Sequence, residues 1–264
     1  ASLSQRLIMG LVLALVAIIL FSSVPAYIAM WQQLERQVWE RVEHGQDATQ
    51  ALYRAEITRM KKLVGLFANR PTLNQLVLAG DTAGLEPYLD ELQWEGGNLD
   101  MAQVVTPDFL VGDPLPGLPP PDEFLAGNEP YFADLISLGD PPSLYIVSVS
   151  QVQPAARDAE PLGWVVLAQQ LHSAAMLTLQ EETGLAQSLI VGEQRVATSL
   201  PGTPNWPMNI DAAIQAETNG QHYYIKGRIG SELYYFGLIP LRSSHGDVVA
   251  LSEVALAGSA IRRE

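Results

Sequence analysis

The sequence lacks cysteine and, beyond position 70, has very few basic residues. With no cysteine among 264 residues there can be no disulfide. This suits an oxidising compartment, although a cysteine-free cytosolic protein would look the same. Residues 71–261 carry only five basic side chains against 23 acidic ones. Phosphate binding depends on clustered Lys and Arg, so this charge balance excludes nucleic acid as a partner and disfavours docking on anionic lipid.

Motifs for catalysis and for metal binding are also absent. The four histidines lie far apart in the sequence and form no H-E-x-x-H spacing. There is no G-x-S-x-G nucleophile elbow and no phosphate-binding P-loop. We therefore predict no catalytic residue, no metal ligand and no cofactor, and we expect each histidine to be an ordinary surface residue.

The N-terminal region contains a long apolar segment. No charged residue occurs in 7–34, and the almost wholly apolar stretch 7–31 exceeds the roughly 20 residues that an α-helix needs to cross a bilayer. The alternative is a cleaved signal peptide, with Arg6 before the apolar run and a small-residue site at 24–26. The run continues past that site to Trp31, so an uncleaved transmembrane helix over 7–31 fits better. The flanking charges do not determine its orientation.

A long helix is predicted to follow over residues 32–70. It contains no proline before Pro71, which ends it because the residue before a proline is pushed away from α geometry. Apolar residues recur along it at alternating spacings of four and three: Tyr53, Ile57, Met60, Val64 and Phe67. This spacing is typical of a coiled-coil seam or of a helix packed on its own domain. Either arrangement, or both at different heights, would suit a stalk through which the chain forms a homodimer.

Residues 71–171 read as a first α+β module. Helical spacing predicts short helices over 73–78 and 84–92, and we also predict a helix over 131–138. Strands are expected at 101–105, 109–111, 144–152 and 162–171, with a proline-rich surface loop at 114–122. Alternation in the strand at 144–152 places Leu144, Ile146, Ser148 and Ser150 on one face and Tyr145, Val147 and Val149 on the other.

The same order returns in compressed form over residues 172–258. A helix at 172–183 precedes a hairpin with strands at 189–191 and 195–197, and a short helix at 210–216 precedes three strands at 221–229, 233–241 and 248–256. The fold class is therefore α+β: a transmembrane helix, a stalk helix and two tandem modules, each with an antiparallel sheet covered by helix.

Three stretches carry a resemblance to a known family. Residues 162–167, 183–200 and 235–251 resemble the join between modules and the strands of the second module in double Cache sensors, which are PAS-like. These sensors are the extracytoplasmic regions of bacterial histidine kinases, diguanylate cyclases and chemoreceptors. The resemblance covers residues 8–261. It implies that the modules lie outside the inner membrane, extracellular or periplasmic, with 71–171 distal and 172–258 proximal to the bilayer. It also implies that 259–264 lead to a second membrane helix and a cytoplasmic output domain.

Candidate ligand-binding residues come from the first module, because the membrane-distal module usually binds ligand in the resembling family. They are Trp94, Tyr131, Tyr145 and Arg157, the last being the only basic residue of that module that could meet a carboxylate. Each aromatic could equally belong to the core or its rim. In the second module, Tyr224, Lys226 and Arg228 share one strand face, as an anion cradle or as a solvated surface.

Two functions of different classes remain open from the sequence. One is the ligand-sensing region of a membrane receptor, which would bind a small molecule of unknown class and pass the stimulus through the stalk helix. The other is a single-pass scaffold whose anionic outer domain binds other proteins. A membrane-anchored hydrolase is a third reading, disfavoured by the missing catalytic motifs.

Overall fold

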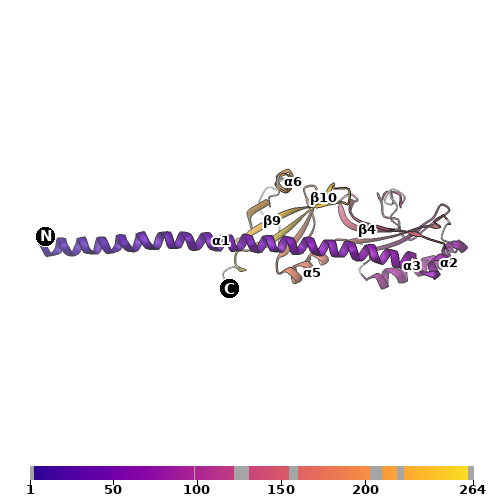
Figure 1. The fold of residues 1–264 in the computed structure, drawn as a ribbon, viewed down its shortest axis with the longest axis horizontal. Coiled ribbons are helices and arrows are strands. Elements are labelled where there is room, and N and C mark those ends of the chain that lie inside the picture. The colour runs from indigo at the N-terminus through magenta and orange to yellow at the C-terminus, as the bar shows by residue number, and fades with distance from the viewer. Residues whose placement is uncertain are drawn as a thin grey trace.

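The chain folds as one long helix that carries two antiparallel sheets side by side along its length (Figure 1). The computed structural model describes residues 3–97, 99–121, 131–154, 160–202, 210–218 and 223–260, without the side chains of 3–14, 16–22, 210 and 216–217. The fold is α+β, as the sequence predicts.

Helix α1 (Leu3–Ala68) is continuous through Pro25 and ends just before Pro71. The apolar seam predicted from the sequence faces the protein's own sheets: Tyr53, Met60, Val64 and Phe67 are buried and Ile57 is partly buried. The helix-on-domain interpretation therefore accounts for the spacing of these five residues, and a pairing of two stalks would have to use the other side of α1.

Sheet A follows the two short helices α2 (Pro71–Ala79) and α3 (Thr82–Gly96). Its strands are β1 (Met101–Val105), β2 (Leu110–Val111), β3 (Tyr131–Leu138), β4 (Ser143–Val152) and β5 (Gly163–Gln170). They lie in the order β2-β1-β5-β4-β3, and every neighbouring pair is antiparallel. Pro71 at the first position of α2 suits a proline that needs no amide donor there.

The prediction of a helix over Tyr131–Leu138 is wrong, because this segment forms strand β3. It pairs with β4 in unbroken register from Tyr131 opposite Ser150 to Leu138 opposite Ser143. An eight-residue segment rich in aromatic and branched residues satisfies either periodicity, and its pairing with the exposed edge of β4 decides the outcome.

Sheet B follows α5 (Ser173–Thr183). Its strands are β6 (Ala186–Val191), β7 (Gln194–Thr198), β8 (Tyr223–Ile229), β9 (Glu232–Arg242) and β10 (Val248–Ala257), in the order β7-β6-β10-β9-β8. Helix α6 (Ile210–Thr218) precedes β8. The predicted strands and helices of residues 172–258 are confirmed to within a few residues at each end.

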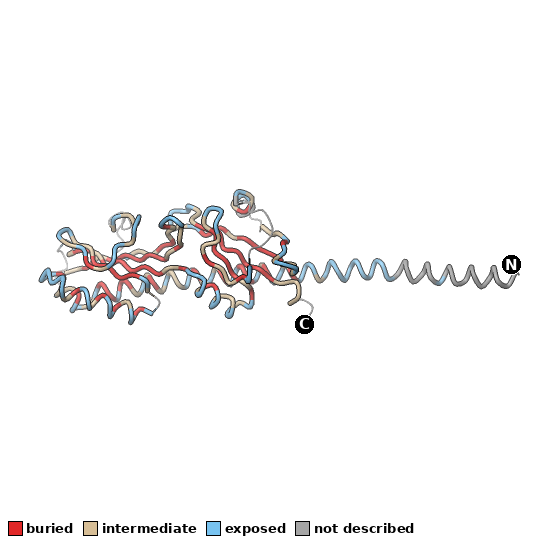
Figure 2. The backbone as a smooth tube through the Cα atoms, turned by 180° about the vertical axis from the view of Figure 1, so that it is seen from behind, coloured by how far each residue is buried: buried red, intermediate tan, exposed pale blue. Residues whose placement is uncertain are grey.

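Each sheet has a stalk face, which packs on α1, and an outer face, which points away from it (Figure 1). The stalk face of sheet A and part of sheet B share one apolar core with α1. This core includes Met60, Leu167 and Leu241. A second apolar cluster, which includes Val42, Tyr235 and Val254, packs another part of sheet B on α1. Buried residues therefore follow the strands and the inward side of α1, as Figure 2 shows.

The N-terminal part of α1 extends beyond the sheets, and its described side chains are exposed, including Tyr27 and Trp31 (Figure 2). Among the side chains that the structure describes, no helix combines the length and the apolar character that crossing a bilayer requires. The side chains of most residues in the predicted span 7–31 are not among those described, and residues 261–264 of the predicted exit lie outside the described residues.

Candidate functional site on the outer face of sheet A

The outer face of sheet A combines an apolar floor with polar groups along its margins. Strand alternation brings Met101, Val147, Val149, Val166 and Ala168 into one buried cluster on this face. Leu115 and Leu118 of the proline-rich segment pack against the cluster. Small-molecule sites usually have this composition, with an apolar lining and a few polar groups that orient the ligand.

Two polar side chains on this face make no hydrogen bond with the residues that the structure describes. Gln103 is only 4% exposed as a residue, although its amide atoms are not among those fully shielded from solvent. The indole nitrogen of Trp164 is shielded from solvent and has no such partner. Gln103 lies opposite Val166, two residues from Trp164 on β5, so the two side chains are diagonal neighbours on one face. Buried polar groups in proteins are normally hydrogen-bonded, so the shielded indole nitrogen of Trp164, with the amide of Gln103 beside it, marks a candidate place for a ligand.

The four residues predicted from the sequence are not brought together. Tyr145 lies on the outer face and packs at the edge of the apolar cluster. Tyr131 belongs to the stalk-face register and lies over Gly65 and Lys61 of α1. Trp94 is 89% exposed near the end of α3, and Arg157 lies outside the described residues. Of the aromatic residues named from the sequence, Tyr145 alone faces the candidate site.

The sequence pattern around Gln103 is itself informative, although Gln103 is not among the residues predicted from the sequence. In Met101–Val105, alternation puts Gln103 on the same side as Met101 and Val105, so a polar residue occupies a position that the pattern reserves for an apolar one. Trp164 carries no such mark, since an aromatic residue in a strand is ordinary.

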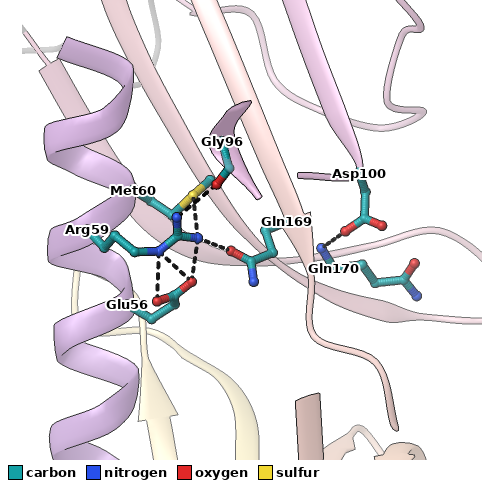
Figure 3. A network of polar contacts seen from close by, with 7 residues as sticks. All are labelled: Glu56, Arg59, Met60, Gly96, Asp100, Gln169 and Gln170. Carbon is teal, nitrogen blue, oxygen red and sulfur yellow. Dashed lines mark hydrogen bonds and ion pairs between the residues drawn. The ribbon is translucent and has the colours of Figure 1, made fainter. Parts of the chain in front are cut away.

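The first sheet is tied to the stalk helix by a polar network around Arg59 (Figure 3). The guanidinium donates to Glu56 on the same helix, to the backbone oxygen of Gly96 at 3.1 Å and to the side-chain oxygen of Gln169 at 2.9 Å. At the neighbouring position, the backbone amide of Gln170 donates to the carboxylate of Asp100 at 2.6 Å. One α1 side chain therefore connects the end of α3, strand β5 and the stalk.

Replacing Arg59 by Met should lower the free energy of unfolding by about 1–2 kcal/mol, because bonds from a charged group to Gly96 and Gln169 are lost while the side chain is partly exposed. Arg36→Met removes an exposed pair with Glu40 on the same helix and should cost less than about 0.5 kcal/mol. Denaturant unfolding of both variants measures the difference. Equal losses would show that Arg59 contributes no more than a surface ion pair.

The outer face of sheet B differs because an internal ion pair fills it. Glu253 on the central strand β10 is fully buried, and it accepts two hydrogen bonds from Arg195 at 3.0 and 2.7 Å. The hydroxyls of Ser188 and Thr198 bond to each other beside it at 2.9 Å. The charged groups on this face therefore already satisfy one another.

The possible anion cradle of sheet B, formed by Tyr224, Lys226 and Arg228, contacts residues of α1. Lys226 pairs with Glu35 of α1, and this hydrogen bond lowers the pKa of Glu35 below its ordinary value. The ring of Tyr224 packs on Trp39, and burial, together with the charges of Glu43 and Asp47, raises the pKa of Tyr224 to about 12. Arg228 is exposed. Lys226 and Tyr224 therefore form part of the attachment of sheet B to α1.

A separate hollow of about 610 Å³ lies between α3 and the edge of sheet A. Its acidic side chains, Glu86, Asp90 and Asp113, give it a negative character. Within the described residues no group of three or more His, Asp or Glu is arranged to hold a metal ion. The unpaired Gln103 and Trp164 make the outer face of sheet A the stronger candidate.

Comparison with known proteins gives matches only at the level of structure. No family model matches the sequence, and no curated protein matches it. The periplasmic domain of Vibrio cholerae LuxQ aligns with a TM-score of 0.58 at 12% identity, over 82% of this chain and 100% of that one. A domain of a sensory box/GGDEF family protein from Vibrio parahaemolyticus aligns with a TM-score of 0.56 at 9% identity, over 87% and 99%.

A third similar structure contains a bound ligand. The ligand-binding domain of the Campylobacter jejuni chemoreceptor Tlp3, in complex with 4-methylisoleucine, aligns with a TM-score of 0.54 at 11% identity, over 89% of this chain and 94% of that one. By description, the LuxQ domain is periplasmic, the Vibrio parahaemolyticus domain belongs to a sensory box/GGDEF family protein, and the Tlp3 domain is ligand-binding. At these identities the likeness is one of fold, and it agrees with the double PAS-like α+β arrangement that the resemblance to double Cache domains implies.

Proposed function

We propose that this chain is the extracytoplasmic ligand-sensing region of a membrane receptor, and that it binds a small molecule on the outer face of sheet A. The observation that carries the proposal is the buried indole nitrogen of Trp164, which has no partner among the described residues, beside the amide of Gln103 on an apolar floor. A ligand with a polar group and an apolar body would satisfy both features. Tyr145 is the proposed third contact.

The ligand class that we propose is a small amino acid or a related compound. The structurally similar Tlp3 domain is described in complex with 4-methylisoleucine, which combines an apolar side chain with charged polar groups. The outer face of sheet A has the matching composition, with a branched-chain floor of Val147, Val149 and Val166 and polar groups at its margin. Arg157, proposed from the sequence as a carboxylate partner, remains a candidate for the acidic end of such a ligand.

In this proposal α1 carries the signal. It contacts β3, β4 and β5 of sheet A as well as β9 and β10 of sheet B, so a shift of either sheet changes its packing. Residues 7–31 would anchor the helix in the inner membrane, and residues 259–264 would lead toward a second span and an output domain. Two stalks would pair in a homodimer. A differential affinity of a few kcal/mol between two states would suffice to shift such a receptor.

Thermal unfolding of the detergent-solubilised chain tests ligand binding directly. A ligand that binds only the folded state at about 100 times its Kd stabilises by roughly 2.7 kcal/mol, which corresponds to a rise in the midpoint of roughly 5–10 °C. The panel should contain L-valine, L-isoleucine, amines, dicarboxylates, nucleobases and sugars. We expect a concentration-dependent rise with the amino acids.

A matched pair of variants locates the site. Gln103→Leu replaces a mostly buried side chain, whose amide makes no hydrogen bond with the described residues, by an apolar group of similar size, so the unliganded midpoint should stay equal or rise while the ligand-induced shift is lost. Ser148→Ala removes a buried unpaired hydroxyl from the stalk face of the same sheet and should leave the shift intact. An unchanged shift in Gln103→Leu would place the ligand elsewhere. No shift with any compound would favour the protein-binding scaffold.

A further inference from the structure

The turn between β9 and β10, residues 243–247, lies against sheet A although it belongs to sheet B. The carboxylate of Asp134 on β3 accepts hydrogen bonds from both the backbone nitrogen and the hydroxyl of Ser244, each at 2.8 Å. His245 of the same turn lies beside the ring of Phe132, with ring centroids 6.4 Å apart. Two sequence-distant segments are thereby joined at the far edge of sheet A.

Asp134 faces the side of sheet A that carries the candidate site. Its β4 partner is Val147, and Val147 belongs to the outer-face cluster. Phe132 pairs with Val149 in the same way. A hollow of about 480 Å³ is lined both by β3, through Phe132, Asp134 and Ile136, and by the turn, through Ser243, His245 and Asp247. The turn therefore borders the outer face of sheet A.

The attachment is strong because the carboxylate is buried. Asp134 is only 6% exposed, and a buried carboxylate is costly unless its oxygens accept hydrogen bonds. It accepts three in all: one from the amide of Leu135 at 2.8 Å and two from Ser244. Undocking the turn would leave the charge with a single described donor, so the turn is held in place by the need to solvate Asp134.

The turn itself is preformed for this contact. The nitrogen of Ser243 donates to the oxygen of Asp247, Gly246 donates back to the oxygen of Ser243, and Gly246 has the positive φ of 90° that favours glycine. The guanidinium of Arg242 donates to the oxygen of Gly246 at 2.7 Å. A rigid turn can present both donors of Ser244 at once without ordering cost at the contact.

We propose that Asp134 is a positioning residue that holds the β9–β10 turn as a wall of the ligand site, so that the second sheet senses occupancy of the first sheet directly and not through α1 alone. This rests on the proposed function for its ligand, which must extend along the outer face from Gln103 and Trp164, on β1 and β5, to the hollow beside β3, where it would contact the turn. Its binding energy then differs between docked and undocked turns, which is the requirement for moving a two-state element.

Hydrogen exchange of the unliganded full chain, resolved to single amides, tests the attachment. Asp134→Val introduces a β-branched residue that suits a strand and removes both acceptor oxygens. We expect the amide of Ser244 to lose protection by about tenfold to a hundredfold, as for a lost hydrogen bond to a charged group. The amides within β5 and β10 should keep theirs. Asp134→Asn retains one acceptor and should recover much of the protection.

Two further variants make the test specific and independent of folding problems at position 134. Ser244→Ala removes the hydroxyl donor from an exposed turn residue, and the Asp134→Val/Ser244→Ala double variant should lose no more protection than Asp134→Val alone, since both changes break one contact. His245→Ala, which leaves the Asp134 bonds intact, should change protection by less than about twofold. Unchanged protection in Asp134→Val, additive losses in the double variant, or losses spread evenly over both sheets would overturn the proposal.

The ligand-free measurement also separates this proposal from the proposed function. If no compound in the panel raises the unfolding midpoint, the small-molecule function fails while the exchange result still decides whether Asp134 holds the turn. Where L-valine or L-isoleucine does bind, it should alter exchange at Ser244 in the wild-type chain. In Asp134→Val that response should be lost, and an identical response in both chains would overturn the coupling.

Discussion

Replacing Glu253 by Ala should lower the free energy of unfolding by about 3–5 kcal/mol, the largest loss expected from a single polar substitution in this chain. The carboxylate is fully buried on the central strand of sheet B, and its removal takes from the guanidinium of Arg195, only 13% exposed, two charge-assisted hydrogen bonds that offset its desolvation. Denaturant unfolding followed by circular dichroism measures the loss, with an unchanged slope expected.

A paired replacement distinguishes two free energies: the cost of keeping Arg195 when Glu253 is removed, and the net stabilisation that the Arg195–Glu253 ion pair provides. Arg195→Met together with Glu253→Leu removes both charges while keeping much of the buried volume, and it should recover most of the stability lost in Glu253→Ala. If the double variant is as unstable as the single one, the ion pair itself stabilises sheet B, and the loss in Glu253→Ala does not come from the remaining charge of Arg195. The ion pair on the outer face of sheet B would then be a net contributor to stability.

Long periodic elements could be predicted from the sequence because packing agreed with their pattern. Helix α1 ends where Pro71 predicts, and β4 places Ile146 and Ser148 on the stalk face and Val147 and Val149 on the outer face, as alternation requires. The strands of sheet B could be predicted equally well, since glycine-containing turns separate β6 from β7, β8 from β9 and β9 from β10. In these segments local preference and tertiary contacts favour the same structure.

Features that depend on pairing between distant segments could not be predicted. Tyr131–Leu138 becomes a strand because β4 offers it partners, and nothing within its eight residues settles this. The bond between Asp134 and Ser244 joins residues 110 positions apart, and the Gln103–Trp164 neighbourhood depends on the β1–β5 register. Trp94 illustrates the converse, since an aromatic residue that composition suggests for a pocket lies in solvent at the end of α3.

Two identical substitutions in α1 should have opposite effects on stability. A Cβ at Gly45 would lie 2.0 Å from Cδ1 of Leu185 and 3.3 Å from Val254, in a fully packed contact with sheet B. Overpacking of this kind costs about 1–3 kcal/mol, so Gly45→Ala should destabilise the chain. A Cβ at Gly65 would lie 3.6 Å from the ring of Tyr131, an ordinary contact, and Gly65→Ala should stabilise by about 0.5–1 kcal/mol through helix propensity.

The sign at Gly45 bears on how α1 transmits a signal. Close approach at this glycine means that α1 cannot slide or rotate over sheet B without repacking Leu185, which is almost fully buried. Thermal unfolding of both variants therefore reports whether the helix is pinned to the second sheet. Stabilisation by Gly45→Ala as well as by Gly65→Ala would mean that α1 has room over sheet B, and that the Asp134–Ser244 contact is the firmer of the two connections between the sheets.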